Sequence, residues 1–448
     1  MKKEVKFYLT KLIKTKNIIK EKGKYFIIFD EVKPFQINSI IIKNLDKDKI
    51  IILQDNNIIF EYWINQDRLI PPWETNWFQL KDNFLLKLKD DLLKDLINKA
   101  INKAENIFRL SKILNMSYPT FYNFVNNKKI KMISVKKIKS LLYYLNIPYD
   151  HINSKIDYTK KGSKISIKNP KFPINLLNVE GANLLGHIVS DGWIHLDKKA
   201  RNTIRTCYST SEEESINQFI KIINNLYGEV FILKGEIRNC IMIRIGSSII
   251  GESLLKVGGI LGHKAKVNEG VPWLIKYGNV NLKKSYLKAV FEDESSVYYD
   301  KKLYNSYIIL SRYRHLKNLT NSQKDTLNKL EKDMKSNKFP TRHINQRISI
   351  KMALEKIKND INLIQNIKSP PNLLLEESNI LNELGIENRL FGRSLNKNFS
   401  GSFSVGFDLF INKKESIKKF YKEIGYSLEH KKNKLQNIIG GEKNIKII

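Results

Sequence analysis

Apolar and polar residues follow different periods along the chain, and these periods divide it into segments. In residues 1–95, short apolar runs such as 25–29 and 50–53 are separated by turns rich in Asp and Asn, which predicts a small β-rich module. Residues 96–152 carry apolar positions at intervals of three and four, which predicts helices. Residues 153–173 are polar and contain Gly and Pro, so we interpret them as a linker.

Two apolar runs beyond this linker are each predicted to be a helix that ends in an acidic and then a small residue. They are residues 183–192 and residues 286–295. In their alignment Gly186 meets Ala289, Asp191 meets Glu294, and Gly192 meets Ser295. Small residues four apart lie on one helical face and allow two helix backbones to approach closely. The domain-sized interval between the runs predicts an internal repeat.

The aligned acids, Asp191 and Glu294, suggest a metal site. A carboxylate at a helix C-terminus faces the negative end of the helix dipole, which costs about 0.3–1 kcal/mol when it is exposed. Two such carboxylates would also repel each other if the helices packed together. A divalent cation resolves both problems, and oxygen ligands favour Mg²⁺, or Mn²⁺ in its place.

The segments around the first run predict an order of helices and strands. If 193–196 is the first strand, the first half has the order αββαββα. The expected fold class is therefore α+β, and the internal repeat predicts a second half. The expected bounds are 174–275 for the first half, 276–282 for a linker, 283–436 for the second half with an insertion at about 316–366, and 437–448 for a tail.

Residues 107–125 predict a helix, a short turn and a second helix. Ser117 is suited to cap the second helix, and Pro119 to its first turn. This segment, within 96–152, resembles a helix-turn-helix of the phage-repressor type. That resemblance implies DNA contacts from the second helix by Tyr118, Thr120, Tyr122 and Asn123. A helical bundle without a ligand is the alternative.

The formal net charge of +33 favours a polyanionic partner, above all double-stranded DNA. No apolar run is long enough to span a bilayer, and two cysteines without a zinc pattern fit a reducing compartment. We therefore expect a cytoplasmic, nucleoid-associated protein without a membrane partner. The basic residues expected to contact DNA from the strands are Arg201, Arg205, Lys234, Arg238, Arg244, Arg312 and Arg314.

The paired runs 183–192 and 286–295 are similar to the motifs of the LAGLIDADG homing endonucleases, in the single-chain, DOD-type form known from archaeal members. The resemblance covers roughly residues 174–436. It implies a monomer with an internal pseudo-twofold and two pseudo-symmetric αββαββα halves, whose saddle-shaped antiparallel sheets lie along the DNA major groove. It also implies metal-dependent hydrolysis of one phosphodiester bond in each strand.

The same resemblance implies roles for individual residues. Asp191 and Glu294 would hold two or three divalent ions, with the backbone carbonyls of Ser190 and Asp293 as further ligands. Lys264 and Lys431 would be the lysines close to the metals, with Lys266 and Lys432 as the alternatives. Ser295 stands where the family has glycine, which predicts a strained turn. We expect His187, where an apolar residue is usual, to be bonded to a partner.

Three functions follow from these observations. The first is a site-specific double-strand DNA homing endonuclease, encoded in an intron or free-standing. The second is a DNA-binding transcriptional regulator that does not cleave, in which the helix-turn-helix acts with an inactive nuclease scaffold. The third is a maturase that binds intron RNA on the same scaffold. The presence of both Asp191 and Glu294 favours the enzyme, because a pure binder gains nothing from carboxylates that face phosphates.

Overall fold

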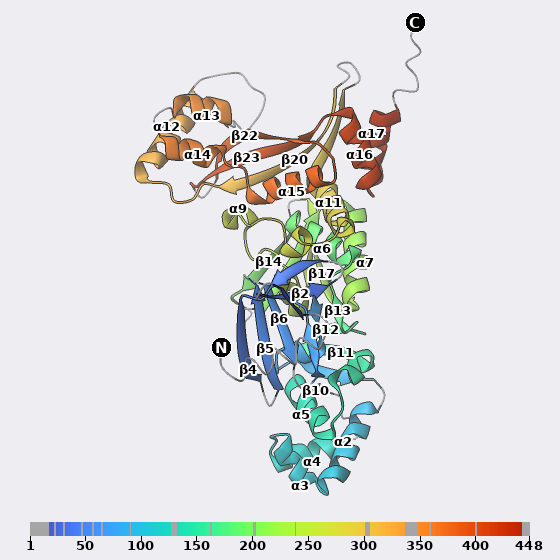
Figure 1. The fold of residues 1–448 in the computed structure, drawn as a ribbon. Coiled ribbons are helices and arrows are strands. Elements are labelled where there is room, and N and C mark those ends of the chain that lie inside the picture. The colour runs from blue at the N-terminus through green and yellow to red at the C-terminus, as the bar shows by residue number, and fades with distance from the viewer. Residues whose placement is uncertain are drawn as a thin grey trace. The chain divides into compact units, whose positions relative to one another are not determined.

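The computed structural model (Figure 1) divides the chain into two compact units. It describes residues 18–21, 24–29, 32–45, 48–55, 58–63, 66–89, 91–126, 132–161, 164–199, 203–237, 239–300, 305–336, 348–357, 360–398 and 401–440. The first unit comprises Met1–Leu184, His195–Val257 and Tyr277–Asn279, and the second comprises Leu185–Ile194, Gly258–Lys276 and Val280–Ile448. No helix among the described residues is long and apolar enough to cross a membrane.

The first unit begins with two antiparallel sheets. The three-stranded sheet has the order β1-β2-β3 (Ile18–Glu21, Lys24–Phe29, Val32–Gln36), and the four-stranded sheet has the order β4-β5-β6-β7 (Ser39–Leu45, Asp48–Asp55, Ile58–Trp63, Arg68–Ile70). Aromatic residues form the core beside them, where Trp63, Trp77, Phe78 and Tyr149 are all buried and in edge contact. The β-rich character expected for this region is present in the structure.

Residues 153–173 are not a linker. Residues 153–155 end the short helix η3 (Tyr149–Lys155), and the hairpin β11–β12 (Ile156–Lys161, Lys164–Lys168) follows it. This hairpin lies in a sheet of order β10-β9-β11-β12-β16, whose other strands are Ile133–Ser134, Leu85–Leu88 and Glu229–Val230. The apolar residues of the hairpin alternate with polar ones, and Ile156 and Ile167 are fully buried. This alternation is typical of strands. The many lysines and the glycine in the same segment favoured the interpretation as a linker instead.

In the described part of the chain, four α-helices lie between β9 and η3. They are α2 (Leu92–Ala104), α3 (Ile107–Ile113), α4 (Tyr118–Asn126) and α5 (Val135–Leu145). Amphipathic spacing explains them, because Leu96, Leu110, Phe121 and Leu142 are buried, whereas Lys94, Arg109, Tyr122 and Tyr143 on the same helices are exposed. The helix, turn and helix expected over 107–125 are thus present as α3 and α4.

The second half of the first unit is built around a four-stranded sheet of order β14-β15-β18-β17. Its elements are α6 (Val179–Val189), β14 (Gly192–Asp197), β15 (Thr203–Thr210), α7 (Glu213–Tyr227), β17 (Ile232–Ile237), β18 (Cys240–Ile245) and α8 (Ser248–Lys256). The boundary between the units falls inside α6 and inside β14. Tyr208 on β15 stacks on Phe219 of α7 at 4.3 Å between ring centroids, so α7 covers that face of the sheet.

The second unit repeats this order of elements. Its elements are α9 (Lys264–Val267), α10 (Trp273–Lys276), α11 (Val280–Glu294), β19 (Ser295–Asp300), β20 (Asn305–His315), α12 (Asn321–Ser336), β21 (Ile348–Ser349), α13 (Ile350–Lys356), α14 (Ile361–Lys368), α15 (Asn372–Glu383), β22 (Arg389–Lys397), β23 (Phe403–Ile411), α16 (Lys414–Glu423) and α17 (Glu429–Gly440). Its sheet has the order β19-β20-β23-β22-β21. With α12, α13, α14 and the short β21 set aside, this is the order of the first sheet.

The mixed α and β architecture with antiparallel sheets is therefore confirmed. The extra helices α12 and α13 fall within the expected insertion at about 316–366, and α14 begins inside it and ends at Lys368. Two boundaries differ from the expectation. Helix α11 begins at Val280, inside the proposed linker 276–282, and α17 continues to Gly440, inside the proposed tail 437–448.

Candidate functional site

The site begins with the close approach of α6 and α11. A Cβ atom placed on Gly186 would lie 2.6 Å from the carbonyl oxygen of Tyr286 and 2.7 Å from Cβ of Ala289. Such distances leave no room for a side chain at position 186, which explains why a glycine stands there opposite Ala289. The close packing predicted from the small residues is confirmed here, and it brings the C-terminal ends of both helices together.

Three consecutive acids at the end of α11 each have a different partner. Glu292 is buried and accepts a hydrogen bond from the backbone N–H of Ser427. Asp293 lies against Nδ1 of His187, at 3.0 and 3.1 Å from its two oxygens, and Glu294 pairs with Arg312. A helix turns by about 100° per residue, so neighbouring side chains diverge. His187 is therefore bonded to a partner, as expected. Burial lowers the pKa of His187, but the charges of Asp293 and Glu292 outweigh it and raise the value.

Asp191, by contrast, has no hydrogen-bond or ion-pair partner among the described residues. Partial burial raises the pKa of its carboxyl to about 7, and the charges of Asp293 and Glu294 act in the same direction. Lys264 and Arg312 oppose this rise without cancelling it. The structure thus holds a carboxylate that is costly to ionise unless another cation is added.

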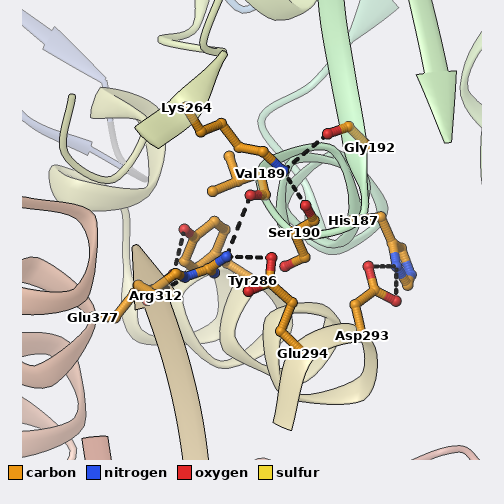
Figure 2. Close-up of polar contacts among 10 residues, drawn as sticks. All are labelled: His187, Val189, Ser190, Gly192, Lys264, Tyr286, Asp293, Glu294, Arg312 and Glu377. Atoms are coloured by element: carbon orange, nitrogen blue, oxygen red, sulfur yellow. Dashed lines mark hydrogen bonds and ion pairs between the residues drawn. The ribbon is translucent and has the colours of Figure 1, made fainter. Parts of the chain in front are cut away.

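Arg312 links the ends of the two motif helices (Figure 2). Its guanidinium donates to Glu294 and, with two nitrogens, to Glu377 at 2.8 and 3.3 Å. It also approaches the carbonyl of Val189 at the end of α6, at 3.5 Å. Glu377 on α15 is fully buried and also accepts from the hydroxyl of Tyr286 at 3.2 Å. These ion pairs raise the pKa of Arg312 despite its burial.

The two candidate lysines occupy equivalent places, one at the end of each motif helix. Lys264 donates to the carbonyls of Ser190 and Gly192, the latter at 2.9 Å (Figure 2). Lys431 donates to the carbonyls of Phe291, Glu292 and Ser295, the last at 2.7 Å. A cation at the carbonyl end of a helix satisfies free acceptors and offsets the negative pole. Burial lowers the pKa of Lys264 to about 8, against the charge of Glu294.

A hydrated divalent ion fits this donor set better than a fully protein-ligated one. The part of the chain that the structure describes has no cluster of three or more His, Cys, Asp or Glu residues that could hold a metal. Mg²⁺ commonly uses one or two carboxylates, with water and phosphate oxygens completing its shell. Asp191 provides such a carboxylate. Glu294 provides a second only by exchanging its bond to Arg312, and the carbonyl of Ser190 already accepts from Lys264.

The turn after Glu294 is not strained. The backbone angle φ of Ser295 is not positive. Its hydroxyl is buried and bonded to the carbonyl of Phe291 and to the hydroxyl of Tyr426, the latter at 2.7 Å. The prediction of a strained turn at Ser295 was therefore wrong. Strand β19 begins at this residue in extended conformation, and the hydroxyl of Ser295 has hydrogen-bond partners.

The strand register separates the basic residues expected to contact DNA on the first sheet. Arg244 is exposed and lies opposite Cys207 on β15, on the same face as Arg205. Lys234 lies opposite Ile243, which is fully buried on the face that α7 covers. Arg205 and Arg244 thus share the open face, and Lys234 points to the other side at the sheet edge. Arg201 and Arg238 lie outside the described residues.

On the second sheet, Arg312 and Arg314 do not face solvent. They continue the face of Ile308 and Leu310 on β20, and their exposed fractions are 6% and 7%. Arg393 on β22 lies on the open face instead, where it bonds Ser311 at 2.9 Å and stacks over Tyr313. Strand β20 continues to His315, so both arginines belong to it, and the alternation of side chains along the strand places them on its buried face.

The four residues of α4 that were predicted to contact DNA are accessible. Tyr118 and Tyr122 are 43% and 46% exposed, and Thr120 and Asn123 are also exposed on α4. Phe108 and Tyr118 are in edge contact at 5.7 Å between ring centroids. Exposed aromatic and amide side chains on one short helix are suited to contacts with a partner. Their role in DNA binding stays a prediction.

No protein-family model matches the chain, and no curated protein matches it. Solved structures do align with it. Mesophilic variants of the homing endonuclease I-DmoI are 15% identical and align over 57% of this chain and 100% of their own, with a TM-score of 0.31. I-DmoI in complex with DNA and Mn is 16% identical over 56% of this chain and 99% of its own, also at 0.31. The N-terminal LAGLIDADG domain of WhiA is 12% identical over 57% and 87%, at 0.25. These scores are too low to establish a shared fold.

Proposed function

We propose that the protein is a metal-dependent, site-specific double-strand DNA endonuclease of the LAGLIDADG homing type. One observation carries the proposal. Asp191, half-buried at the end of a closely packed helix pair, has a raised pKa and no partner among the described residues, in a chain of formal charge +33. A carboxylate without such a partner would bind a cation. The bound cation would also be compatible with a polyanionic substrate.

The residues of this chain would divide the work. Asp191 and Glu294 would hold the ion, Mg²⁺ or Mn²⁺. When bound, such an ion would lower the pKa of a coordinated water and stabilise negative charge on the phosphate. Lys264 and Arg312 would remain beside the phosphate as fixed positive charges. Lys264 is the better candidate for a phosphate contact, because Lys431 already donates to three carbonyls. A single chain would supply both carboxylates, as a monomer with an internal pseudo-twofold.

Cleavage of a randomised double-stranded DNA library tests the proposal, with wild type, Asp191→Asn and Glu294→Gln compared with and without Mg²⁺. We expect Mg²⁺-dependent cuts in both strands from the wild type and none from either variant. Equal, salt-sensitive DNA binding by all three proteins without any cuts would leave a binder. The matched control is Glu415→Gln, which removes an exposed acid from the first turn of α16.

One observation favours a second candidate, a DNA-binding regulator that does not cleave. Arg312 already neutralises Glu294 without a metal ion, and Glu377 holds Arg312 in place. Such a network would stabilise the helix pair in a protein that has no use for a metal. Glu294→Gln separates the two, since it would abolish cleavage in an enzyme and leave DNA affinity unchanged in a regulator.

A further inference from the structure

Arg314 is a buried cation without a counter-ion among the described residues. The residue is 7% exposed, and its guanidinium donates to neutral groups, namely Oδ1 of Asn366 at 2.9 Å, the carbonyl of Asn366, and the carbonyl of Ser369 at 3.0 Å. Its Nε is buried and has no hydrogen-bond partner among the described residues. A buried charge that is left unpaired costs several kcal/mol. The neighbouring Arg312, by contrast, has two carboxylates.

Arg314 lines an open pocket of ≈ 510 Å³ between β20, α12, α14 and the end of α9. The lining is Val267, Asn268, Arg314, His315, Lys317, Asn318, Thr320, Gln323, Asn362 and Asn366, and it contains no carboxylate. Burial and the nearby His263 and Lys266 lower the pKa of His315, which indicates a positive environment. Thr320 and Gln323 cap each other at the start of α12, so the positive end of that helix dipole adjoins the pocket.

Asp360, a carboxylate close to this pocket, is already in use. Asp360 binds the amide of Gln323 at 2.9 Å and caps α14 through the N–H of Leu363. The stretches between residues 301 and 400 that lie outside the described part of the chain contain no Asp or Glu in their sequence. They therefore do not supply the missing negative charge.

We propose that this pocket, here called the Arg314 pocket, binds a phosphate group through Arg314 and Lys317. A guanidinium matches the geometry of phosphate oxygens, and an ammonium adds a point charge. The asparagine side chains offer neutral N–H donors to the remaining oxygens. The lining has no aromatic ring except that of His315, so it selects the phosphate and not a stacked base. The phosphate belongs either to a nucleic-acid backbone or to a free ion or mononucleotide.

The proposal goes beyond DNA cleavage and does not depend on it. The Arg314 pocket contains neither Asp191 nor Glu294. Of the two possible sources of the phosphate, only the nucleic-acid backbone involves nucleic acid. Loss of cleavage in Asp191→Asn therefore leaves this proposal unaffected, and loss of phosphate binding leaves the proposed reaction unaffected.

The first arm of the test measures the affinity of the full chain for a DNA duplex over a range of salt concentrations. The variants are Lys317→Ala and Arg314→Gln, with Lys422→Ala as the control, since Lys422 is an exposed lysine on α16 outside the pocket. If a backbone phosphate occupies the pocket, each pocket variant flattens the log–log salt slope by about 0.9, and the control does not. Lys317 is exposed, so its variant keeps the test valid if Arg314→Gln fails to fold.

The second arm follows inorganic phosphate and adenosine monophosphate by ³¹P line broadening with the same proteins. If the pocket binds free phosphate or a mononucleotide, we expect the ³¹P line to broaden with the wild type and the binding to be at least tenfold weaker with Lys317→Ala. The salt slope of DNA binding should then be unchanged in the pocket variants. The proposal is overturned if Lys317→Ala and a folded Arg314→Gln match the wild type in both arms.

Discussion

At the scale of single residues, the candidate site is defined by how each carboxylate is compensated. Asp293 has His187, Glu294 and Glu377 share Arg312, and Asp191 has no partner among the described residues. The types of these acids were readable from the sequence, since Asp191 and Glu294 stand at matched positions. Their partners were not, because Arg312 and Glu377 come from later elements that the fold brings to the helix ends.

Replacing Arg312 with Met should destabilise the protein by about 3–5 kcal/mol, because Glu377 would be left as a buried, unpaired carboxylate. Urea unfolding monitored by circular dichroism measures the change. The double variant Arg312→Met with Glu377→Met should be more stable than the single variant, because it also removes the unpaired, buried carboxylate of Glu377. Lys413→Met, which breaks an exposed ion pair with Glu387, should cost no more than about 1 kcal/mol. Equal losses in the Arg312 and Lys413 variants would contradict the network.

The raised pKa of Asp191 predicts a pH-dependent response to Mg²⁺. In the metal-free protein its folded-state pKa of about 7 exceeds the ordinary value of 3.8. Its protonated form therefore contributes stability that is full at low pH and is lost as the pH rises through about 7. Bound Mg²⁺ requires the ionised form, so the increase in Tm on adding Mg²⁺ should grow over the same range. Asp191→Asn should show neither effect, and a Tm response to Mg²⁺ that is independent of pH would refute this reading.

At the scale of elements, close helix packing positions the site. Gly186 on α6 faces Ala289 on α11, and lysines cap the carbonyl ends of both helices. With α12, α13, α14 and β21 set aside, the order of elements after each helix is the same, and so is the strand order of each sheet. The packing face was predictable from the spacing of small residues. The capping lysines were proposed from a family resemblance, and the structure adds their physical task.

Gly186→Ala should destabilise the protein by about 1–3 kcal/mol, because its Cβ has no space beside Tyr286 and Ala289. This loss should appear although alanine is the better helix former by about 1 kcal/mol. Thermal and urea unfolding provide the measurement. Gly235→Ala on β17 is the control, since its Cβ would only touch Met242 at an ordinary 3.8 Å. A Gly186 variant as stable as the wild type would mean that the helices do not approach this closely.

At the scale of the whole molecule, charge and its distribution govern the choice of partner. A formal charge of +33 favours a polyanion, but the register decides which cations are presented together. Arg205 and Arg244 lie on the open face of the first sheet, and Arg393 lies on that of the second. Arg312 and Arg314 lie on the opposite face of the second sheet, Arg312 in a buried ion-pair network and Arg314 beside the Arg314 pocket.

DNA affinity should therefore depend on Arg244 and not on Lys234. Arg244→Ala should flatten the log–log dependence of affinity on salt by about 0.9, the loss of one phosphate contact. Lys234→Ala should leave the slope unchanged, because this residue lies on the opposite face of the sheet. Fluorescence anisotropy with a duplex at several salt concentrations separates the two. Equal effects would indicate that total charge alone governs binding.

The sequence by itself determined the features that depend on local periodicity and composition. These are the helical and strand-rich segments, the two motif helices, the small residues between them and the excess of positive charge. It also determined which acids stand at matched positions. Each follows from near neighbours in the chain, where side-chain period and backbone preference act directly.

Only the tertiary structure decided which groups meet. It placed Arg312 and Glu377 at the helix ends, turned Arg314 inward beside a pocket, and converted an apparent linker into β11 and β12. Such contacts depend on strand register and on where a strand ends, and a shift of one residue moves a side chain to the opposite face. For this reason Asp191 could be recognised from the chain alone, whereas its lack of a partner became visible only in the folded protein.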